Sequence, residues 1–394
     1  MQNCKRKKII WAVLAAVLLT GCKSDAAVNP SPTEGVLDLS GLQETDKLDG
    51  DPWCNGFTEV AETGRGLYFL ESAHIDAGGN FLCYYDYESQ RAIRVCNRPD
   101  CNHSDETCNA YFVDNLPKKF YELVNLKWYD NAIYLPFVES GKRVLYRVSA
   151  DGSSREEVTE LFDTEINPVV DGGITSTSYS YMDICIHRGY VYFIMDKGGA
   201  EGLCRKKLEG NSPVETIIPA NVMRTTVYRM EPYGKYLFFQ KGRYNEDETE
   251  LESSIYAYDV ETQELLEVKE NVLSTYVIKD AVLYYAVAGE GIYAYSLKDG
   301  KEELAVGIEE NCFVLQKTDY GFIISTAVDT RVFDDDGNLL LTMECFPDYM
   351  NSERLVYREI DENAQGYYRM ANISEPDPTK WEWQDVRCEL TDGK

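Results

Sequence analysis

The octapeptide Leu145-Tyr146-Arg147-Val148-Ser149-Ala150-Asp151-Gly152 recurs in altered copies along the chain, and this repetition indicates the fold class. Each copy begins with a large aliphatic residue, alternates its side chains as a strand does, and ends in a turn of Asp, Glu, Gly or Thr. The copies begin at Leu82, Leu145, Leu203, Ile255, Ile292 and Val332. The interval between Leu82 and Leu145 is the longest, at 63 residues.

A second, aromatic element precedes each copy and consists of a small turn followed by an apolar strand, as in Gly189-Tyr190-Val191-Tyr192-Phe193. Its other copies begin at Gly66, Asn131, Gly234, Asp280 and Tyr320, and Gln365-Gly366-Tyr367-Tyr368 resembles a seventh. Short strands at even spacing predict blades around an axis, and such blades must stack into a closed ring to bury their faces. We therefore expect an all-β fold, a β-propeller of about seven blades (six to eight), over residues 51–394.

Closure of the ring requires its first and last segments to meet. We expect residues near Trp53 to Val60 to pair with the C-terminal strand near Trp381 to Val386. Cys54 and Cys388 lie near the two ends of the ring, so a closing disulfide between them is a further option.

The first 22 residues have the three zones of an export signal. A basic patch, Lys5 to Lys8, precedes an apolar run from Ile9 to Leu19, which is about half the ~20 residues that a membrane-spanning helix needs. Leu19-Thr20-Gly21-Cys22 resembles the lipobox of bacterial lipoproteins. The resemblance implies a signal peptide over residues 1–21, cleavage before Cys22, and a lipid on that cysteine that labelled palmitate would report. An ordinary secretory signal with an unmodified Cys22 is the alternative.

Residues 22–50 are expected to form a flexible tether, since Ser, Pro, Asp, Gly and Thr are frequent there and apolar residues are scattered. The lipid on Cys22 and this tether would hold the protein outside the cytoplasm, anchored to the cell membrane.

The Leu145–Gly152 string also resembles the repeats of bacterial propeller lipoproteins of unknown function, which are similar to YWTD-type and TolB-type propellers. The chain has no YWTD tetrapeptide and no Trp-Ser-Pro-Asp-Gly string. The resemblance implies the architecture and no site residues, because propellers host both binding and catalysis.

The net charge of the chain limits the classes of partner that it is expected to bind. The net charge is −28, and loss of residues 1–21 leaves 35 basic against 67 acidic residues. Such a chain repels phosphate backbones, which excludes nucleic acid as an expected partner. It also repels anionic lipid, so the membrane is expected as a partner only through the lipid on Cys22.

Cys96, Cys101, His103 and Cys108 form the sharpest local motif, with the pattern C-x4-C-x-H-x4-C. Three thiolates and one imidazole are the ligand set of a structural zinc site, and we take these four residues as candidate metal ligands. Because an export route permits disulfides, a bridge within Cys96/Cys101/Cys108 is the alternative, and a plain loop with free thiols is a third. Each interpretation makes the motif structural and not catalytic.

The sequence contains no recognisable catalytic motif. It lacks a G-x-S-x-G elbow, a P-loop and a dinucleotide fingerprint, and His187 is expected at the surface or at a sheet edge. The leading hypothesis is a non-enzymatic binding or interaction module for an extracellular glycan, peptide or envelope protein, and an exposed Trp128 would suit stacking on sugars or peptides. The alternatives are a glycan-active hydrolase or lyase using channel carboxylates, and a structural subunit of an envelope complex, which a large exposed apolar patch on one rim would support.

Overall fold

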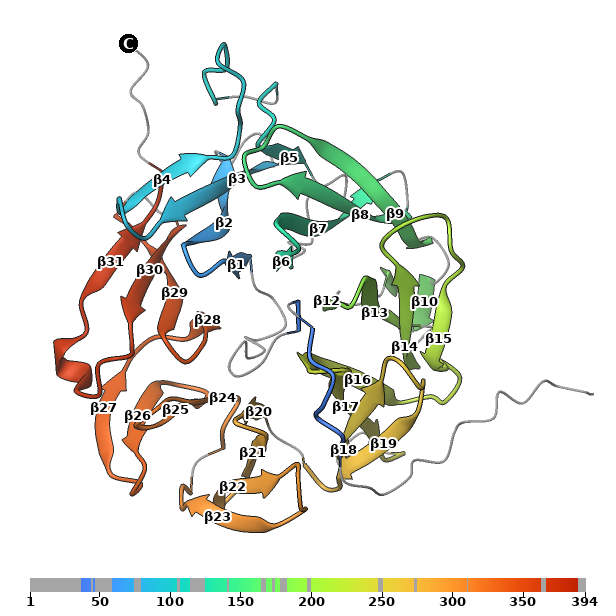
Figure 1. Cartoon of the computed structure of the whole chain (residues 1–394), viewed down its shortest axis with the longest axis vertical. Coiled ribbons are helices and arrows are strands. Elements are labelled where there is room, and N and C mark those ends of the chain that lie inside the picture. The colour runs from blue at the N-terminus through green and yellow to red at the C-terminus, as the bar shows by residue number, and fades with distance from the viewer. Residues whose placement is uncertain are drawn as a thin grey trace, which may run out of the picture. The chain divides into compact units, whose positions relative to one another are not determined.

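The repeated strings form equivalent strands in the computed structural model of the protein. The copies beginning at Leu82, Leu145, Leu203, Ile255, Ile292 and Val332 are the third strands of successive antiparallel sheets, of which the first has five strands and the others four. The aromatic elements before them are the second strands. Seven such sheets are arranged around a central axis as the blades of a β-propeller (Figure 1). The expected all-β propeller of about seven blades is thereby confirmed.

The structure describes residues 37–43, 45–46, 59–73, 79–104, 107–113, 125–139, 142–163, 168–171, 174–177, 183–196, 200–246, 251–272, 275–309, 311–362 and 366–388. The signal peptide and Cys22 lie outside these residues. Within them no helix has the length and apolar character needed to cross a membrane.

Each blade runs from an innermost first strand to its outermost strand. Blades 1 and 2 contain β1 (Val60–Glu62), β2 (Gly66–Ala73), β3 (Gly79–Asp86), β4 (Arg91–Arg94) and β5 (Tyr111–Val113), then β6 (Lys127–Tyr129), β7 (Ala132–Glu139), β8 (Lys142–Ser149) and β9 (Arg155–Asp163). A separate hairpin, β10 (Pro168–Asp171) and β11 (Ile174–Thr177), leads to blade 3, with β12 (Ile184–His187), β13 (Tyr190–Asp196), β14 (Glu201–Lys207) and β15 (Glu215–Ile218). Blades 4 and 5 contain β16 (Thr225–Tyr233), β17 (Tyr236–Tyr244), β18 (Leu251–Asp259) and β19 (Leu265–Lys269), then β20 (Tyr276–Lys279), β21 (Val282–Val287), β22 (Gly291–Ser296) and β23 (Glu302–Val306). Blades 6 and 7 contain β24 (Val314–Lys317), β25 (Gly321–Ser325), β26 (Thr330–Asp334) and β27 (Leu339–Met343), then β28 (Pro347–Met350), β29 (Arg354–Ile360), β30 (Gly366–Asn372), the 3-10 helix η2 (Pro378–Lys380) and β31 (Trp383–Val386).

The seventh aromatic element has a different place from the one its pattern suggests. Gly366 to Tyr368 begin β30, the third strand of blade 7, whereas the second strand is β29. The turn before β29 contains no glycine, because the Asn351 carboxamide oxygen accepts the backbone N–H groups of Glu353 (2.9 Å) and Arg354 (2.7 Å) and so shapes that turn. The sequence signature of a second strand is therefore missing in blade 7.

The expected strand exchange between the two ends of the ring is wrong for the C-terminal strand. β31 pairs with β30 inside blade 7, and Val60 pairs with Phe69 inside blade 1, so among the described residues no strand pairing joins the two ends. Residues 53–58, including Cys54, lie outside the described residues. Side-chain hydrogen bonds between the two blades include Tyr85 to Gln384 (3.0 Å), Tyr368 to Glu59 (3.0 Å) and Asn351 to Glu62 (3.2 Å).

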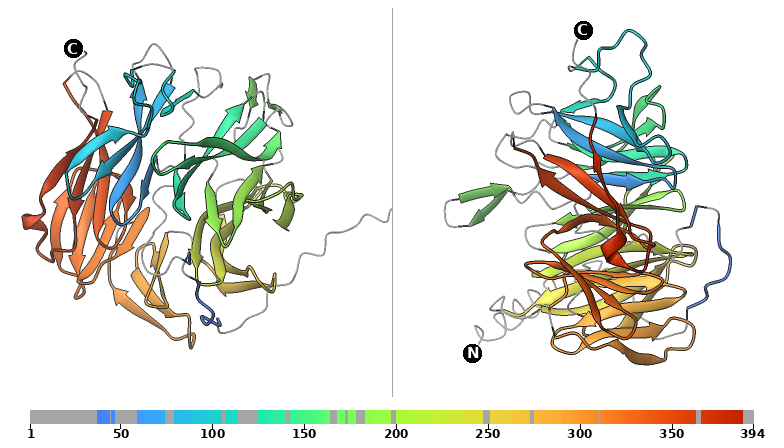
Figure 2. Two further views of the ribbon diagram at one scale, coloured as in Figure 1. Left: turned by 45° about the horizontal axis from the view of Figure 1, so that its top comes forward. Right: turned by 90° about the vertical axis from the view of Figure 1, so that its left-hand side faces the viewer.

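The ring has two unlike faces. We call "upper" the face that holds the connections between blades and the turns between second and third strands, and "lower" the face that holds the other turns. The β10–β11 hairpin, which belongs to the connection between blades 2 and 3, projects from the upper face. Residues 37–46 run along the opposite side (Figure 2, right). One face of the propeller is thus partly covered by the chain's own N-terminal segment.

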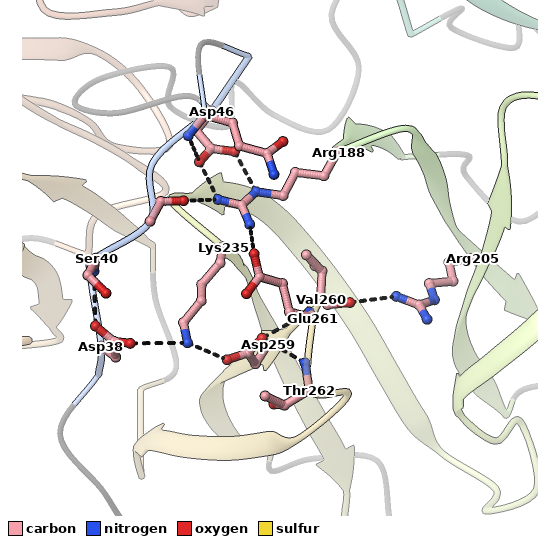
Figure 3. Close-up of polar contacts among 12 residues, drawn as sticks. Asp38, Ser40, Asp46, Arg188, Arg205, Lys235, Asp259, Val260, Glu261 and Thr262 are labelled. Carbon is pink, nitrogen blue, oxygen red and sulfur yellow. Dashed lines mark hydrogen bonds and ion pairs between the residues drawn. The ribbon is translucent and has the colours of Figure 1, made fainter.

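The described part of the predicted tether packs against blades 3, 4 and 5 of the lower face. Leu37 is buried in a core cluster with Tyr233 and Tyr236. Asp46 accepts hydrogen bonds from the Arg188 guanidinium (2.7 and 2.5 Å), and both side chains are almost fully buried (Figure 3). The folded unit therefore includes residues before position 51, and the tether expected over residues 22–50 contains residues that belong to the ring.

His187 is buried and not at the surface as expected. Only 1% of it is exposed, at the end of β12 next to Arg188. Burial lowers the pKa of His187 to about 4, against a weaker opposing effect of the Asp46 carboxylate. The sequence around His187 does not predict that it is buried. Residues 37–46 contribute to covering it, and their composition is that of a tether.

Candidate functional site

The cysteine and histidine motif is an insertion at a position where the other blades are already irregular. In blades 2 to 6 the pairing of the third and fourth strands shifts register directly after the first residue of the repeated string, as at Leu203 and Ile255. In blade 1 the fourth strand is interrupted opposite the matching residue of the third strand, Leu82. The Val95 N–H donates to the Leu82 carbonyl (2.8 Å), and the Leu82 N–H donates to the Ala110 carbonyl (2.8 Å). The loop thus leaves and rejoins the outer strand at one point, between β4 and β5.

The four predicted ligands converge within this loop. The Sγ atoms of Cys96, Cys101 and Cys108 and one ring nitrogen of His103 all lie within 4.8 Å of one another. The His103 Nδ1 atom is 3.5 Å from the Cys108 Sγ atom. The three cysteines are free thiols in the structure, so each sulfur is open to a metal ion.

Backbone N–H groups point at each of the three sulfurs. The His103 N–H donates to Cys101 Sγ (3.4 Å), and those of Arg98 and Asn109 donate to Cys96. Although burial opposes this effect, the two N–H groups lower the pKa of Cys96. Burial raises the pKa of Cys108 to about 12, and the hydrogen bond from the Ala110 N–H opposes this rise. N–H donors favour the thiolate form, which is the form that binds metal.

Arg94, the last residue of β4, binds the backbone of the loop. Its guanidinium donates to the carbonyl of His103, whose backbone is left-handed (φ 55°). The same guanidinium lies 3.4 Å from a carboxylate oxygen of Glu71 and 3.8 Å from the ring centre of Phe81. The centre is therefore fixed to blade 1 by a side chain that precedes the first ligand by two positions.

The loop also touches blade 2. Gly152, in the turn between β8 and β9, approaches the insertion so closely that a Cβ atom there would lie 2.3 Å from the Val95 carbonyl oxygen. Asn109 donates to the Gly152 carbonyl (3.5 Å). The insertion thus lies on the outer strand of blade 1 against a turn of blade 2, a location that suits a structural role.

A second group of candidate ligands has no signature in the sequence. Ligand atoms of Glu71, Cys83 and Cys388 lie within 4.8 Å of one another. Cys83 is fully buried, Cys388 is 7% exposed, and both are free thiols. No sequence signal could have joined them, because the two cysteines belong to opposite ends of the ring.

Two carboxyl groups with raised pKa lie between blades 7 and 1, where their inner strands begin. Burial raises the pKa of Glu59, and burial raises the pKa of Asp348 to about 6. Glu59 accepts from the Tyr368 hydroxyl (3.0 Å) and lies 3.6 Å from the Arg358 guanidinium, while Asp348 accepts the Arg358 backbone N–H (2.6 Å). Both carboxyl groups are thus bound to groups of blade 7.

Exposed apolar side chains gather on the upper face. Of the thirteen large apolar residues that are exposed in the described ranges, seven belong to its turns and connections: Val222, Met223, Tyr244, Phe313, Val328, Phe346 and Ile360. Trp128 is not among them. Its ring stacks on Tyr68 at 5.4 Å, so it packs between blades 1 and 2. These seven side chains are candidates for contact with a partner.

Comparison with solved structures supports the fold. Puromycin hydrolase is 12% identical with a TM-score of 0.52, over 93% of this chain and 58% of that one. The β-propeller domain of the Trilobed protease from Pyrococcus furiosus is 10% identical (TM-score 0.48; 86% and 98% covered). BamB from Moraxella catarrhalis is 12% identical (TM-score 0.42; 88% and 89% covered). No protein-family model and no curated protein matches the sequence. At 12% identity, the likeness to puromycin hydrolase supports the fold and carries no function over to this chain.

Proposed function

We propose that the protein is a lipid-anchored, extracytoplasmic interaction module whose upper face binds a protein or peptide partner without catalysis. The observation that carries this proposal is the seven exposed apolar side chains on that face, which equally suit the alternative of a subunit of an envelope complex. Met223 (58% exposed), Phe313 (46%) and Ile360 (70%) are large side chains that a soluble protein gains nothing by exposing. Burial of one such side chain at an interface contributes about 1.5–3 kcal/mol.

The position of residues 37–46 supports an orientation of the ring. The export signal and the lipobox-like sequence before Cys22 favour a lipid on that residue. The chain that follows reaches the propeller on its lower face, where Asp46 binds Arg188. The lower face is then the one nearer the membrane, and the upper face is turned to partners outside the cell.

The Cys/His centre is proposed to hold one structural zinc ion. Three sulfurs that each receive a backbone N–H, together with one imidazole nitrogen, match the donor set of such a site. The zinc ion would neutralise thiolates in a loop that has no strand pairing between Val95 and Ala110. Cys96, Cys101, His103 and Cys108 would hold it, and its role would be to order the insertion against blades 1 and 2.

Purified without chelator, the protein is expected to contain about one zinc per chain, with all three thiols of the centre free after denaturation. Cys101→Ser and His103→Ala should each lower the zinc content at least tenfold, because a tetrahedral site that loses one ligand binds far more weakly. Cys345→Ser changes a cysteine outside the centre and should leave the zinc content unchanged. A protein without metal, in which two of the three thiols are missing, would establish the disulfide instead.

One observation favours the alternative of a glycan-active enzyme: the raised pKa values of Glu59 and Asp348 between blades 7 and 1. Their partners argue against it. Tyr368 and Arg358 already engage the two carboxyl groups and tie blade 7 to blade 1. We therefore assign these acids to ring closure and keep binding as the proposed function.

The proposed binding face is tested by selecting molecules that bind the protein from a library of random peptides and from a glycan array. Peptides that bind the mature protein are expected to lose at least tenfold in affinity for the double variant Met223→Ser/Phe313→Ser, since tenfold corresponds to about 1.4 kcal/mol. The matched control, Ile93→Ser/Leu304→Ser, changes two apolar residues on outer strands that are equally exposed (62% and 51%). Equal losses in both double variants, or binders found only among glycans, would refute the proposal.

A further inference from the structure

We propose that Cys83 and Cys388 form a disulfide that closes the ring covalently. Cys83 lies in β3 of blade 1, and Cys388 follows β31 of blade 7. In the structure both are free thiols, with their sulfurs within 4.8 Å of each other. This proposal is independent of the interaction surface and of the zinc centre.

The construction of the ring gives the disulfide a role. No strand is exchanged between blades 7 and 1 in the described ranges, so the seam between them lacks the backbone ladder that joins strands within a blade. Beyond the last strand, the chain contacts blade 1 through a single backbone bridge, between Cys388 and Ala92. A covalent bond at this point would join segments about 300 residues apart, and cross-links across long loops restrict the unfolded chain most.

The surroundings of the two thiols favour a disulfide over a second metal ion. Glu71, the third member of the group, accepts the Cys388 N–H on one carboxylate oxygen (3.2 Å) and binds Arg94 through the other (3.4 Å). The carboxylate is therefore already neutralised by a guanidinium. Burial is the main cause that raises the pKa of Cys83. With Glu71 engaged, two sulfurs remain, which is enough for a disulfide but too few for the four ligands of a structural zinc site.

The sulfurs must still approach to the bond length of about 2.05 Å. Cys83 is fixed in the middle of a blade, whereas Cys388 lies beyond the end of β31 at Val386. We therefore expect the segment after Val386 to supply the movement. In the reaction the two thiols lose two electrons and two protons to a small-molecule disulfide, which is cleaved to two thiols as the Cys83–Cys388 bond forms.

Peptide mapping of the mature protein tests this directly. After incubation with oxidised glutathione and alkylation of the remaining thiols, non-reduced digests are expected to contain the Cys83 peptide joined to the Cys388 peptide. Reduction should then lower the Tm by about 5 °C. Cys388→Ser should abolish this Tm difference, and Cys204→Ala, which changes a buried cysteine of blade 3, should retain it.

Three results would overturn the proposal. The first is that Cys83 and Cys388 are both recovered alkylated after oxidation. The second is that Cys388 is found joined to Cys54. The third is a second zinc ion per chain that Cys388→Ser removes. The mapping uses the unmodified protein, so it decides the question even where a cysteine variant fails to fold.

Discussion

Deletion of residues 353–394 is expected to abolish folding. It removes β29, β30 and β31 and leaves the face of blade 1 without a neighbour. Leu67, Phe69, Phe81 and Tyr85 on that face are at most 2% exposed in the intact ring. At about 1.5–3 kcal/mol for each side chain, their exposure alone costs on the order of 10 kcal/mol, which equals the whole stability of an ordinary domain.

Circular dichroism and calorimetry measure this effect. The truncated chain is expected to be insoluble or to show no cooperative melting, because an open ring of incomplete blades cannot bury its end faces. The control lacks only residues 389–394, which follow the last described residue, and should melt as the intact protein does. A soluble truncated chain that is rich in sheet and melts as sharply as the full one would contradict the single closed ring.

The second large effect concerns Glu231, a buried carboxyl group on the inner strand of blade 4. Only 3% of it is exposed, one oxygen accepts the Ile278 N–H (3.4 Å), and no side-chain partner of the other oxygen is found among the described residues. Burial raises the pKa of Glu231 from 4.5 to about 8, against that one hydrogen bond. Between pH 4.5 and 8 the folded protein therefore holds a proton that the unfolded chain releases.

The sign of the pH dependence follows from this proton. Because the folded state binds more protons than the unfolded state in this range, Glu231 stabilises the fold fully below pH 4.5 and loses that contribution as the pH rises to 8. Glu231→Gln, which mimics the protonated acid, should be more stable than the wild type by only about 1 kcal/mol at pH 5. At pH 8 it should be more stable by about 4 kcal/mol.

Urea unfolding at the two pH values checks this result. The comparison between variant and wild type cancels the opposite contribution of His187, whose lowered pKa reduces stability as the pH falls from 6.5 to about 4. Glu264→Gln, at an exposed turn, is the control and should give the same small difference at both pH values. A Glu231→Gln variant that is equally destabilised at pH 5 and pH 8 would show that the carboxyl group is charged in the folded protein.

The sequence predicted the strands of the blades well because their side-chain alternation and turns are local. The first residue of the repeated string even marks the bulge in the fourth strand, and the Cys/His insertion occupies the equivalent position at Leu82. The convergence of Cys96, Cys101, His103 and Cys108 was also predictable, since a short loop limits how far apart they can lie. The exception was blade 7, where an Asn351 turn replaces the expected glycine.

The remaining features depend on contacts between distant segments. Cys83 meets Cys388, Glu59 meets Tyr368, and Asp46 covers the edge next to His187, all across many intervening residues. Composition alone assigns residues up to 50 to a tether, because a segment that docks through a few residues, among them Leu37, Asp38 and Asp46, has the same composition as one that does not dock. The exposed apolar residues of the upper face were likewise unpredictable, since they lie at strand ends or in irregular connections.

The most direct test of the binding face is made in intact cells that produce the full-length protein. A photoreactive benzoyl-phenylalanine replaces Met223 or Phe313 on the upper face, or Ile93 or Leu304 on outer strands as controls. We predict cross-linked adducts with a partner protein from the two upper-face positions and none from the controls. Equal adducts from all four positions, or adducts from the outer strands alone, would contradict an upper face that binds the partner.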